Sequence, residues 1–385
     1  MAVAQPTASA APRDAALDGL RAIAALSVFG FHAWLYTLGD VHVAAAPKTL
    51  ANDLFAELRI GLVLFFVLSG FLLYRAWVHA ALTGRPGPST ATYAVRRVGR
   101  IIPAYWLAII GSALLLYPLA GSPGVRLPPA HLLPLFFIFA QNFSGQTLLK
   151  LDPPMWTLVV EATFYVVLAP IGWLALRAGR RRGAQGAIPI ILLLIGIVFN
   201  YLLAGEQYEP VGWSKSLLAM LPYFALGMLV AVLLERRQSA LAATRLWISL
   251  GVLLVAADVA MQIGGNAAIR IGDLDLVRVI RDLPAAAGFS LIVAAAATRP
   301  TRPLEWRPLV WVGAVSYGLY LWHVPVLLVL RANGLMPITP WGAWLVGLPI
   351  SLLLGWLSLR LIEKPAMAWS RRTKLFGANV RRSAW

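Results

Sequence analysis

Long apolar stretches alternate with short polar loops along the chain from about residue 17 to residue 361. The stretches are roughly 17–23 residues long, and a helix needs about 20 residues to cross the hydrocarbon core of a bilayer. Because lipid offers no hydrogen bonds to an exposed backbone, such a chain crosses the membrane as helices. We therefore predict ten transmembrane helices, over residues 17–38, 59–78, 101–119, 156–176, 188–204, 216–234, 246–263, 277–297, 309–331 and 341–361.

One further apolar segment, "HLLPLFFIFAQNF" at 131–143, is too short to cross the membrane. Counting it as a crossing would also move the basic cluster at 180–182 to the outside, against the usual excess of positive charge in cytoplasmic loops. We expect this segment to be re-entrant or interfacial. The predicted fold is then an all-α polytopic membrane protein of about ten helices, with both termini in the cytoplasm.

The composition agrees with a membrane protein, since 59% of the residues are hydrophobic and 13% are charged. We expect a disordered tail at 1–14, a membrane domain at 15–366 and a basic cytoplasmic tail at 367–385. The first apolar stretch is too long for a cleavable signal peptide and is expected to stay as an anchor. The absence of cysteine excludes disulfides, thiolate metal sites and an acyl-cysteine intermediate.

The net charge of +17 follows from topology. With the N-terminus in the cytoplasm, about 24 of the 33 Lys and Arg residues lie on the inner side, which is the bias expected for short loops. Most acidic residues then fall in outer loops: Asp40, Asp53, Glu57, Asp152, Glu206, Glu209, Asp273 and Asp275. Contact with anionic lipids explains the remaining basic charge, so we expect a multi-pass protein of the cytoplasmic membrane and no nucleic-acid partner.

The first predicted helix carries three ionisable side chains, Asp18, Arg21 and His32. Arg21 and His32 lie about 20° apart around the helix and about 16 Å apart along it, and Asp18 is one turn before Arg21. Arg21 is therefore expected at the cytoplasmic headgroups and His32 deep in the bilayer, where ionisable groups normally face a cavity or the protein interior. A headgroup anchor for Arg21 and an interhelical hydrogen bond for His32 are the purely structural alternatives.

Two neighbouring predicted helices carry further candidates. In "RRVGRIIPAYW", Arg97 and Arg100 share one helix face. Paired guanidiniums at a helix start suit a phosphate group, although an anchor against the inner membrane surface explains them equally well. In the preceding helix, Ser69 and Gly70 interrupt an apolar sequence, where small residues either allow close packing or line a cavity.

Polar groups also recur at helical spacing in two later predicted helices. Glu161 lies about two turns into the fourth helix and Tyr165 follows one turn later on the same face. A carboxylate at this depth needs a partner. In the ninth helix, Ser316, Tyr320 and His323 form one polar stripe, which is either structural or part of a cavity. No pair of histidines has metal-ligand spacing, so we expect no metal site.

Taken together, these motifs resemble acyltransferase family 3, integral-membrane proteins that include O-acetylases of bacterial polysaccharides and peptidoglycan and macrolide O-acyltransferases. The resemblance extends from Leu17 to about Lys364. The sequences that carry it are "LDGLRAIAALSVFGFH", "FFVLSGFL", "RRVGRIIPAYW", "MWTLVVEATFYV", "SYGLYLWHVPV" and "EKP". It also implies ten helices with cytoplasmic ends.

The resemblance implies transfer of an acyl group, usually acetyl, from a cytoplasmic acyl-CoA to a hydroxyl group. His32 is similar to the family's essential histidine and Arg21 to its motif partner. Arg97 and Arg100 are similar to the pair associated with the phosphates of the donor, and Glu161 to the glutamate of the later helix. The histidine would act as a base or as an acyl carrier. Further candidate cavity residues are Asp18, Ser69, Trp156, Tyr165, Ser316, Tyr320 and His323.

The acceptor stays open between a glycan, a lipid-linked sugar and a macrolide-type molecule, as do the acyl length, the side of transfer and the oligomeric state. The chain resembles the stand-alone members of the family, without an appended esterase-like domain. A proton-coupled transporter or flippase is the alternative function, because His, Glu and Arg inside a membrane also suit a proton relay. We find no inverted repeat in the sequence that would support it.

Overall fold

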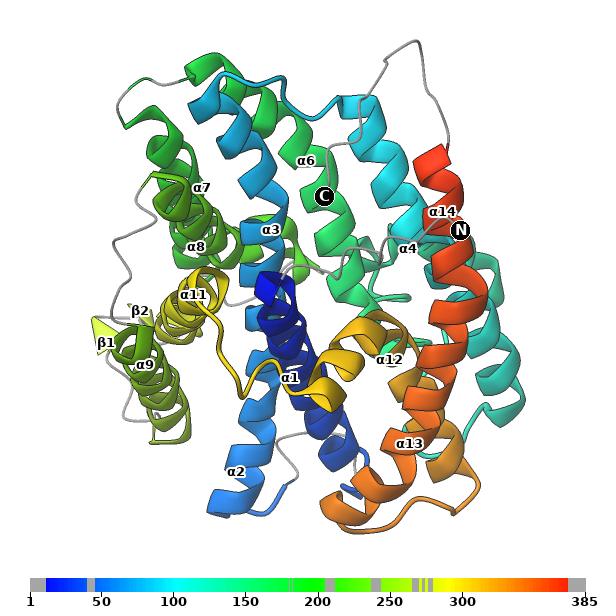
Figure 1. The fold of residues 1–385 in the computed structure, drawn as a ribbon. Helices are drawn as coiled ribbons and strands as arrows, with labels where there is room; N and C mark the ends of the chain where they lie inside the picture. Colours follow the sequence, from blue (N-terminus) through cyan, green and yellow to red (C-terminus); the bar gives the residue numbers. More distant parts are fainter. Residues whose placement is uncertain are drawn as a thin grey trace, which may run out of the picture.

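The computed structural model describes residues 12–39, 46–179, 181, 183–204, 212–236, 244–264, 270–271, 274–275 and 280–372. Over these residues the protein is a bundle of long helices, with one short antiparallel pair, β1 (Arg270–Ile271) and β2 (Leu274–Asp275) (Figure 1). Nine of the described helical stretches are long and apolar enough to cross a membrane. The predicted all-α, multi-pass membrane fold is confirmed.

The main helices of the crossing stretches follow the predicted order. They are α1 (Pro12–Leu35), α3 (Gly61–Thr83), α4 (Thr90–Leu116), α6 (Trp156–Ala178), α7 (Ala184–Ala204), α8 (Leu217–Arg236), α9 (Thr244–Gly264), α12 (Arg307–Ala332) and α13 (Pro340–Ser358). Two of them are extended by shorter helices. α2 (Leu50–Glu57) and η2 (Leu58–Ile60) lead into α3, and the π-helical turn η8 (Leu359–Glu363) and α14 (Lys364–Arg372) follow α13.

The two predicted tails only partly coincide with the described residues. Residues 1–11 lie outside them, and α1 already begins at Pro12, inside the tail predicted for 1–14. The tail predicted for 367–385 starts as helix, because α14 continues to Arg372. Residues 373–385 lie outside the described part of the chain.

The eighth predicted helix, 277–297, is shorter than expected. Its place is taken by α11 (Leu283–Thr298), which has 16 residues and follows Asp282 in a left-handed conformation with φ 60°. A proline in the first turn fixes this start. At 1.5 Å per residue the helix is about 24 Å long, less than the thickness of the hydrocarbon core. Residues 277–279 lie outside the described chain.

The short apolar segment at 131–143 does not form a crossing helix. It breaks into η4 (Ala130–Leu132), α5 (Pro134–Phe137) and η5 (Gln141–Phe143), and Phe139 between them has a positive φ of 58°. A proline and a left-handed residue so close together prevent a continuous helix. The remaining turns are η3 (Tyr117–Leu119), η6 (Pro153–Met155) and η7 (Trp213–Lys215).

The centre of the bundle is formed by α1, α3, α8 and α12, with α3 packed on α8 and α1 packed on α12 (Figure 1). In the most apolar window of each helix, 78% of α12 and 72% of α8 are buried, against 11% in both α7 and α9. The outer helices therefore present most of their apolar side chains to lipid, while the central helices hold the polar groups considered below.

Close approach of α3 and α8 depends on two glycines. A Cβ atom on Gly70 would lie 2.1 Å from the carbonyl oxygen of Phe224, and one on Gly227 would lie 2.0 Å from that of Val67. Backbone therefore meets backbone across this contact, as small residues allow in membrane helix pairs. Gly70 therefore allows close helix packing, whereas its neighbour Ser69 lines a pocket. Both roles considered for this small-residue pair are present, one for each residue.

We predict that Gly227→Ala destabilises the protein, because the new methyl group has to push two central helices apart. Overpacking of this kind costs about 1–3 kcal/mol. The matched control is Gly186→Ala in α7, where a Cβ atom meets nothing within 4 Å. Thermal unfolding of both purified variants in detergent measures the effect, and equal midpoints would show that the α3–α8 contact tolerates a wider spacing.

Candidate active site

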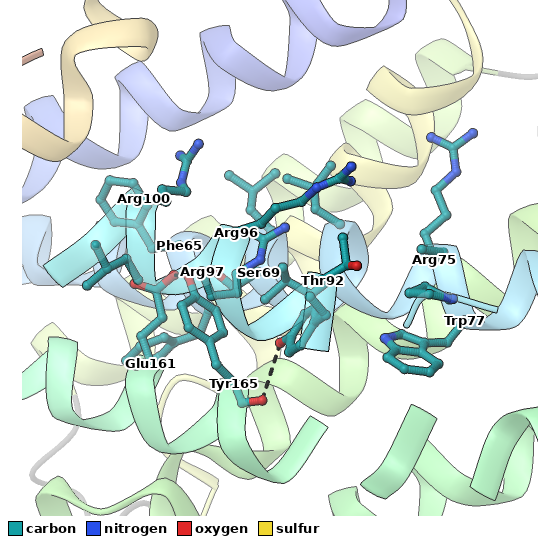
Figure 2. Close-up of a pocket in the computed structure, with 18 of the residues that line it drawn as sticks. Phe65, Ser69, Arg75, Trp77, Thr92, Arg96, Arg97, Arg100, Glu161 and Tyr165 are labelled. Carbon is teal, nitrogen blue, oxygen red and sulfur yellow. Dashed lines mark hydrogen bonds between the residues drawn. The ribbon is translucent and has the colours of Figure 1, made fainter. Parts of the chain in front are cut away.

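A pocket of 1180 Å³ extends along one face of α3, and residues of α4, α6 and α12 complete its walls (Figure 2). The α3 residues that line it run from Leu62 to Ala80, a distance of about 27 Å at 1.5 Å per residue. Pockets for drug-sized ligands hold about 300–1,000 Å³. The size and length of this pocket suit a long ligand.

Basic side chains dominate the polar lining of the pocket. Six arginines and two glutamates line it: Arg21, Arg75, Arg85, Arg96, Arg97, Arg100, Glu161 and Glu235. Glu235 is 3.3 Å from Nε of Arg75 and 2.9 Å from Nδ1 of His79. Arg21 pairs with Asp18 and also lies within electrostatic range of Arg100. The pocket therefore carries more positive than negative charge.

The three arginines of α4 have no carboxylate within 4.0 Å among the described residues. The Nε atoms of Arg96 and Arg97 are buried and lack a hydrogen-bond partner there. The guanidinium of Arg97 lies 5.6 Å from the ring centre of Tyr93 and 5.7 Å from that of Tyr165, at cation–π distance. Buried donors without an acceptor are costly, so this end of the pocket is built to receive an anion.

Glu161 finds its partners on α6 and α3. The hydroxyl of Tyr165 donates to its Oε1, and Oγ of Ser69 lies 3.3 Å from the same oxygen. The hydroxyl of Tyr93 on α4 in turn donates to the Tyr165 carbonyl over 3.3 Å. Figure 2 shows Ser69, Glu161 and Tyr165 close to Arg97 and Arg100 of α4. One small network thus joins three helices at the pocket wall.

Two hydroxyl groups close the opposite end of the pocket. The oxygens of Thr157 and Tyr320 are 2.6 Å apart, and each lies 3.0 Å from the carbonyl oxygen of Pro154. The Tyr320 ring also packs on Phe65, with ring centres 6.0 Å apart. Ser316, one turn before Tyr320, lines the same end.

The two candidate histidines form a pair directly behind this closed end. Nε2 of His323 lies 3.3 Å from Nδ1 of His32, and the His323 ring centre is 5.6 Å from that of Tyr320. His323 is fully enclosed, whereas His32 is half-buried. Neither lines the pocket of the arginines. From the sequence we expect His32 and the arginines in one cavity. In the structure the arginines line the pocket and His32 does not, because the Tyr320 ring lies between them.

The position of His32 within its helix also differs from the prediction. The sequence predicts this helix over 17–38, whereas α1 covers 12–35, so His32 lies in its last turn. The side chain is therefore further from the end of α1 that carries Arg21 than from the opposite end. This places the histidine pair toward the face of the bundle opposite the α4 arginines.

The pocket brings together most of the residues singled out from the sequence. Those that line it are Arg21, Ser69, Arg97, Arg100, Glu161, Tyr165, Ser316 and Tyr320. Asp18, His32, Trp156 and His323 do not. Asp18 instead holds Arg21. The ring of Trp156 lies 4.9 Å from the ammonium of Lys215, and its carbonyl accepts from Asn142, so Trp156 anchors loops outside the pocket.

Three polar residues in or near the site are not predicted from the sequence, and only the first of them lines the pocket. Arg96 stands in the same motif as Arg97, and the sequence alone does not distinguish it from an arginine that anchors the helix at the membrane surface. Its position in the pocket makes that distinction. Glu363, buried in the π-helical turn, accepts from Ser358 over 3.2 Å and lies within electrostatic range of Arg100. Asp152 was counted only as an outer-loop acid, although it stands directly before two prolines and the Trp156 motif.

Asp152 is only 1% exposed, and neither carboxylate oxygen has a hydrogen-bond partner among the described residues. It lies within electrostatic range of Tyr36, Tyr105 and Tyr320. Burial raises the pKa of this carboxyl well above its usual value, because the charged form is poorly solvated there.

Comparison with known proteins identifies the group to which this chain is related. The model of an acyltransferase domain, that of acyltransferase family 3, matches residues 14–360. The chain belongs to acyltransferase family 3. It is a multi-pass membrane enzyme that transfers acyl groups other than amino-acyl groups. Among its described residues no group of three or more His, Cys, Asp or Glu side chains could hold a metal ion.

Several curated proteins are similar to this acyltransferase. Nodulation protein 10 of Rhizobium leguminosarum bv. viciae is 28% identical over 372 residues, 91% of this chain and 92% of that protein. The exopolysaccharide production protein ExoZ of Rhizobium meliloti is 26% identical over 332 residues, 84% and 94% of the two chains.

The putative peptidoglycan O-acetyltransferase YrhL of Bacillus subtilis is 26% identical over 371 residues, 91% of this chain but 54% of that protein. The acyltransferase thus spans about half the length of YrhL. No solved structure matches the chain.

We predict that Asp152→Asn makes the stability of the acyltransferase less dependent on pH. The raised pKa means that the folded state prefers the protonated carboxyl. Wild-type stability is therefore greatest below the ordinary pKa of about 3.9 and falls as pH rises toward the folded-state value. Asparagine has no charge to gain or lose, so the unfolding midpoints of variant and wild type should diverge increasingly as pH rises above about 4.

The matched control is Asp53→Asn, which changes a partly exposed carboxylate at the start of α2. It should follow the wild-type midpoint across the same pH range. Parallel curves for Asp152→Asn and the wild type would show that the Asp152 carboxyl is solvated or paired in the folded protein.

Proposed function

We propose that this acyltransferase moves an acyl group, acetyl in the simplest case, from an acyl-CoA to a hydroxyl group of a glycan. We place it in the cytoplasmic membrane with both chain ends in the cytoplasm. The observation that carries the proposal is a long pocket with the α4 arginines, which pair with no described carboxylate, at one end and polar hydroxyls at the other. A CoA thioester has the same polarity, with an anionic nucleotide at one end and the reactive carbonyl at the other.

The nucleotide end of the donor would lie at the start of α4. Guanidinium groups bind phosphate oxygens through paired, charge-assisted hydrogen bonds. Arg96, Arg97 and Arg100 offer such donors, and none of the described carboxylates lies within 4.0 Å of them. The basic loops on this side of the bundle favour its cytoplasmic orientation, which is where acyl-CoA is made. The diphosphate and the 3′-phosphate of CoA would balance the surplus positive charge of the pocket.

The pantetheine arm would follow α3 toward Tyr320. This arm spans on the order of 15–20 Å when extended, within the roughly 27 Å over which α3 lines the pocket. Leu62, Phe65 and Leu72 supply an apolar wall along this path. The arm would carry the thioester toward the Thr157–Tyr320 contact, behind which the histidine pair lies.

The transfer itself needs a base for the acceptor hydroxyl. As the hydroxyl oxygen attacks the thioester carbon, a C–O bond forms, the C–S bond breaks, and His32 takes the hydroxyl proton. The same proton then neutralises the departing thiolate. General base catalysis of this kind contributes about 10²–10⁴ in rate. For the acyl carbon to meet His32, the Tyr320 side chain has to turn away from Thr157.

A glycan acceptor is favoured by the relatives and by the position of His32. YrhL is named for peptidoglycan O-acetylation and ExoZ for exopolysaccharide production, and glycans present many hydroxyl groups. His32 is half-buried in the last turn of α1, at the end opposite Arg21. An acceptor would thus approach the histidine from the outer side, while the donor enters from the inner side. Incubation with labelled acetyl-CoA and extraction of acylated glycans tests the overall reaction.

We predict that Arg97→Gln combined with Arg100→Gln weakens acetyl-CoA binding. Hydrogen bonds between charged groups contribute about 1.5–3 kcal/mol each, so the double variant should bind at least about tenfold more weakly in calorimetry. The matched control is Arg177→Gln, because Arg177 stacks on Trp173 at 3.6 Å and lies outside the pocket. Unchanged affinity in the double variant would reduce both arginines to anchors at the membrane surface.

We predict that His32→Ala lowers acyl transfer by about 10²–10⁴ while leaving acetyl-CoA affinity unchanged, because His32 does not line the donor pocket. Enzyme assays and calorimetry on the same preparation separate the two effects. His131→Ala is the control, since that side chain is exposed. A His32→Ala protein that keeps most of its activity would refute the assignment of the base. Labelled acyl group bound to wild-type His32 would instead favour an acyl-histidine intermediate.

A further inference from the structure

His32 and His323 present four ring nitrogens, and three of these have partners. Nδ1 of His323 lies 2.7 Å from the carbonyl oxygen of Tyr320. Nε2 of His323 faces Nδ1 of His32 at 3.3 Å, and Nδ1 of His32 also lies 2.9 Å from the carbonyl oxygen of Val28. Nε2 of His32 has no hydrogen-bond partner among the described residues.

This arrangement determines where the protons lie when both rings are neutral. A carbonyl oxygen only accepts, so Nδ1 of His323 carries the hydrogen that bonds to Tyr320. A neutral imidazole has a single N–H, which leaves Nε2 of His323 as an acceptor. Nδ1 of His32 faces this acceptor and a second one, the Val28 carbonyl, and therefore carries hydrogen. The lone pair of His32 is then on its free nitrogen, Nε2.

From this geometry we infer that His323 is a positioning residue for acyl transfer. It accepts from Nδ1 of His32, holds that ring in the tautomer whose Nε2 is a free base, and stabilises the imidazolium formed when Nε2 takes the acceptor's proton. The inference rests on the proposed role of His32 as the base. His323 touches neither the donor pocket nor the outside, so it acts only through His32.

In this pair, the neutral His323 ring takes the part that a carboxylate plays in enzymes where it accepts a hydrogen bond from a catalytic histidine and so orients it. In serine proteases, loss of that orienting acceptor leaves the wrong tautomer and lowers kcat by about 10⁴. A bond between two neutral groups is weaker than a bond to a carboxylate. The Val28 carbonyl also remains as a second acceptor for Nδ1 of His32. Loss of the His323 acceptor should therefore cost less, about 10–100-fold in kcat.

Two substitutions of His323 separate the orienting role from simple packing. His323→Gln keeps an acceptor at the end of the side chain, whereas His323→Phe fills the space between Tyr320 and Phe29 without one. We expect the Gln variant to stay within about tenfold of wild-type kcat and the Phe variant to lose about 10–100-fold, both with unchanged acetyl-CoA affinity. Equal activities, or a more active Phe variant, would show that His323 only packs.

A second measurement reads the tautomer without any activity. The chain has five histidines, and the imidazole signals of the full-length protein labelled with ¹⁵N-histidine report which ring nitrogen carries hydrogen. His32→Gln and His323→Gln assign the two signals, and His131→Gln provides an exposed reference. We expect hydrogen on Nδ1 of His32 in the wild type, and a larger fraction on Nε2 in His323→Phe.

The two measurements distinguish the failure of each proposal. Hydrogen on Nε2 of His32 in the wild type, or a tautomer that His323→Phe leaves unchanged, would overturn the role of His323 whatever the activities are. Full activity of His32→Ala would instead reject the proposed base, even if the spectrum shows the expected tautomer. Loss of activity in His32→Ala together with the expected spectrum supports both.

Discussion

The pocket holds more positive than negative charge among the residues that the structure describes, and its arrangement follows from that surplus. Arg96 and Arg97 line a long pocket, their Nε atoms are buried without a hydrogen-bond partner, and no carboxylate of the described residues pairs with them. Such groups are costly inside a protein unless a ligand supplies the acceptor. Glu161 stands across the pocket but is already engaged by Tyr165 and Ser69. This carboxylate is therefore held by hydroxyl groups and does not pair with the α4 arginines.

The backbone contact between α3 and α8 supports this arrangement. Gly70 and Gly227 let the two helices touch, which fixes the face of α3 that remains open to α4 and α6. At the far end, Thr157 and Tyr320 keep the pocket apart from the histidine pair. In an enzyme that handles a thioester, such a partition also keeps water from the reactive carbonyl until an acceptor is present.

How much the sequence predicts depends on whether a feature lies within one helix or between helices. Crossing helices follow from apolar length, and residues three or four positions apart, such as Arg97 and Arg100, share a face in any register. The contact of Ser69 with Glu161 and that of His32 with His323 join different helices, so they depend on a register that no spacing reveals. Helix ends differ from the prediction for local reasons, such as the left-handed Asp282 before α11. The sequence does not single out Asp152 either, because its burial depends on neighbouring helices.

The contact between Thr157 and Tyr320 has a consequence for substrate range. Under the proposed function the acyl group meets these two hydroxyls before Tyr320 turns away, so every methylene added to the transferred group has to fit against them while the nucleotide stays at α4. The depth of the pocket then limits the length of the acyl group that the enzyme accepts. Substitutions at Thr157 or Tyr320 would change that length. Related enzymes with a smaller side chain in place of Tyr320 would be expected to carry longer fatty groups.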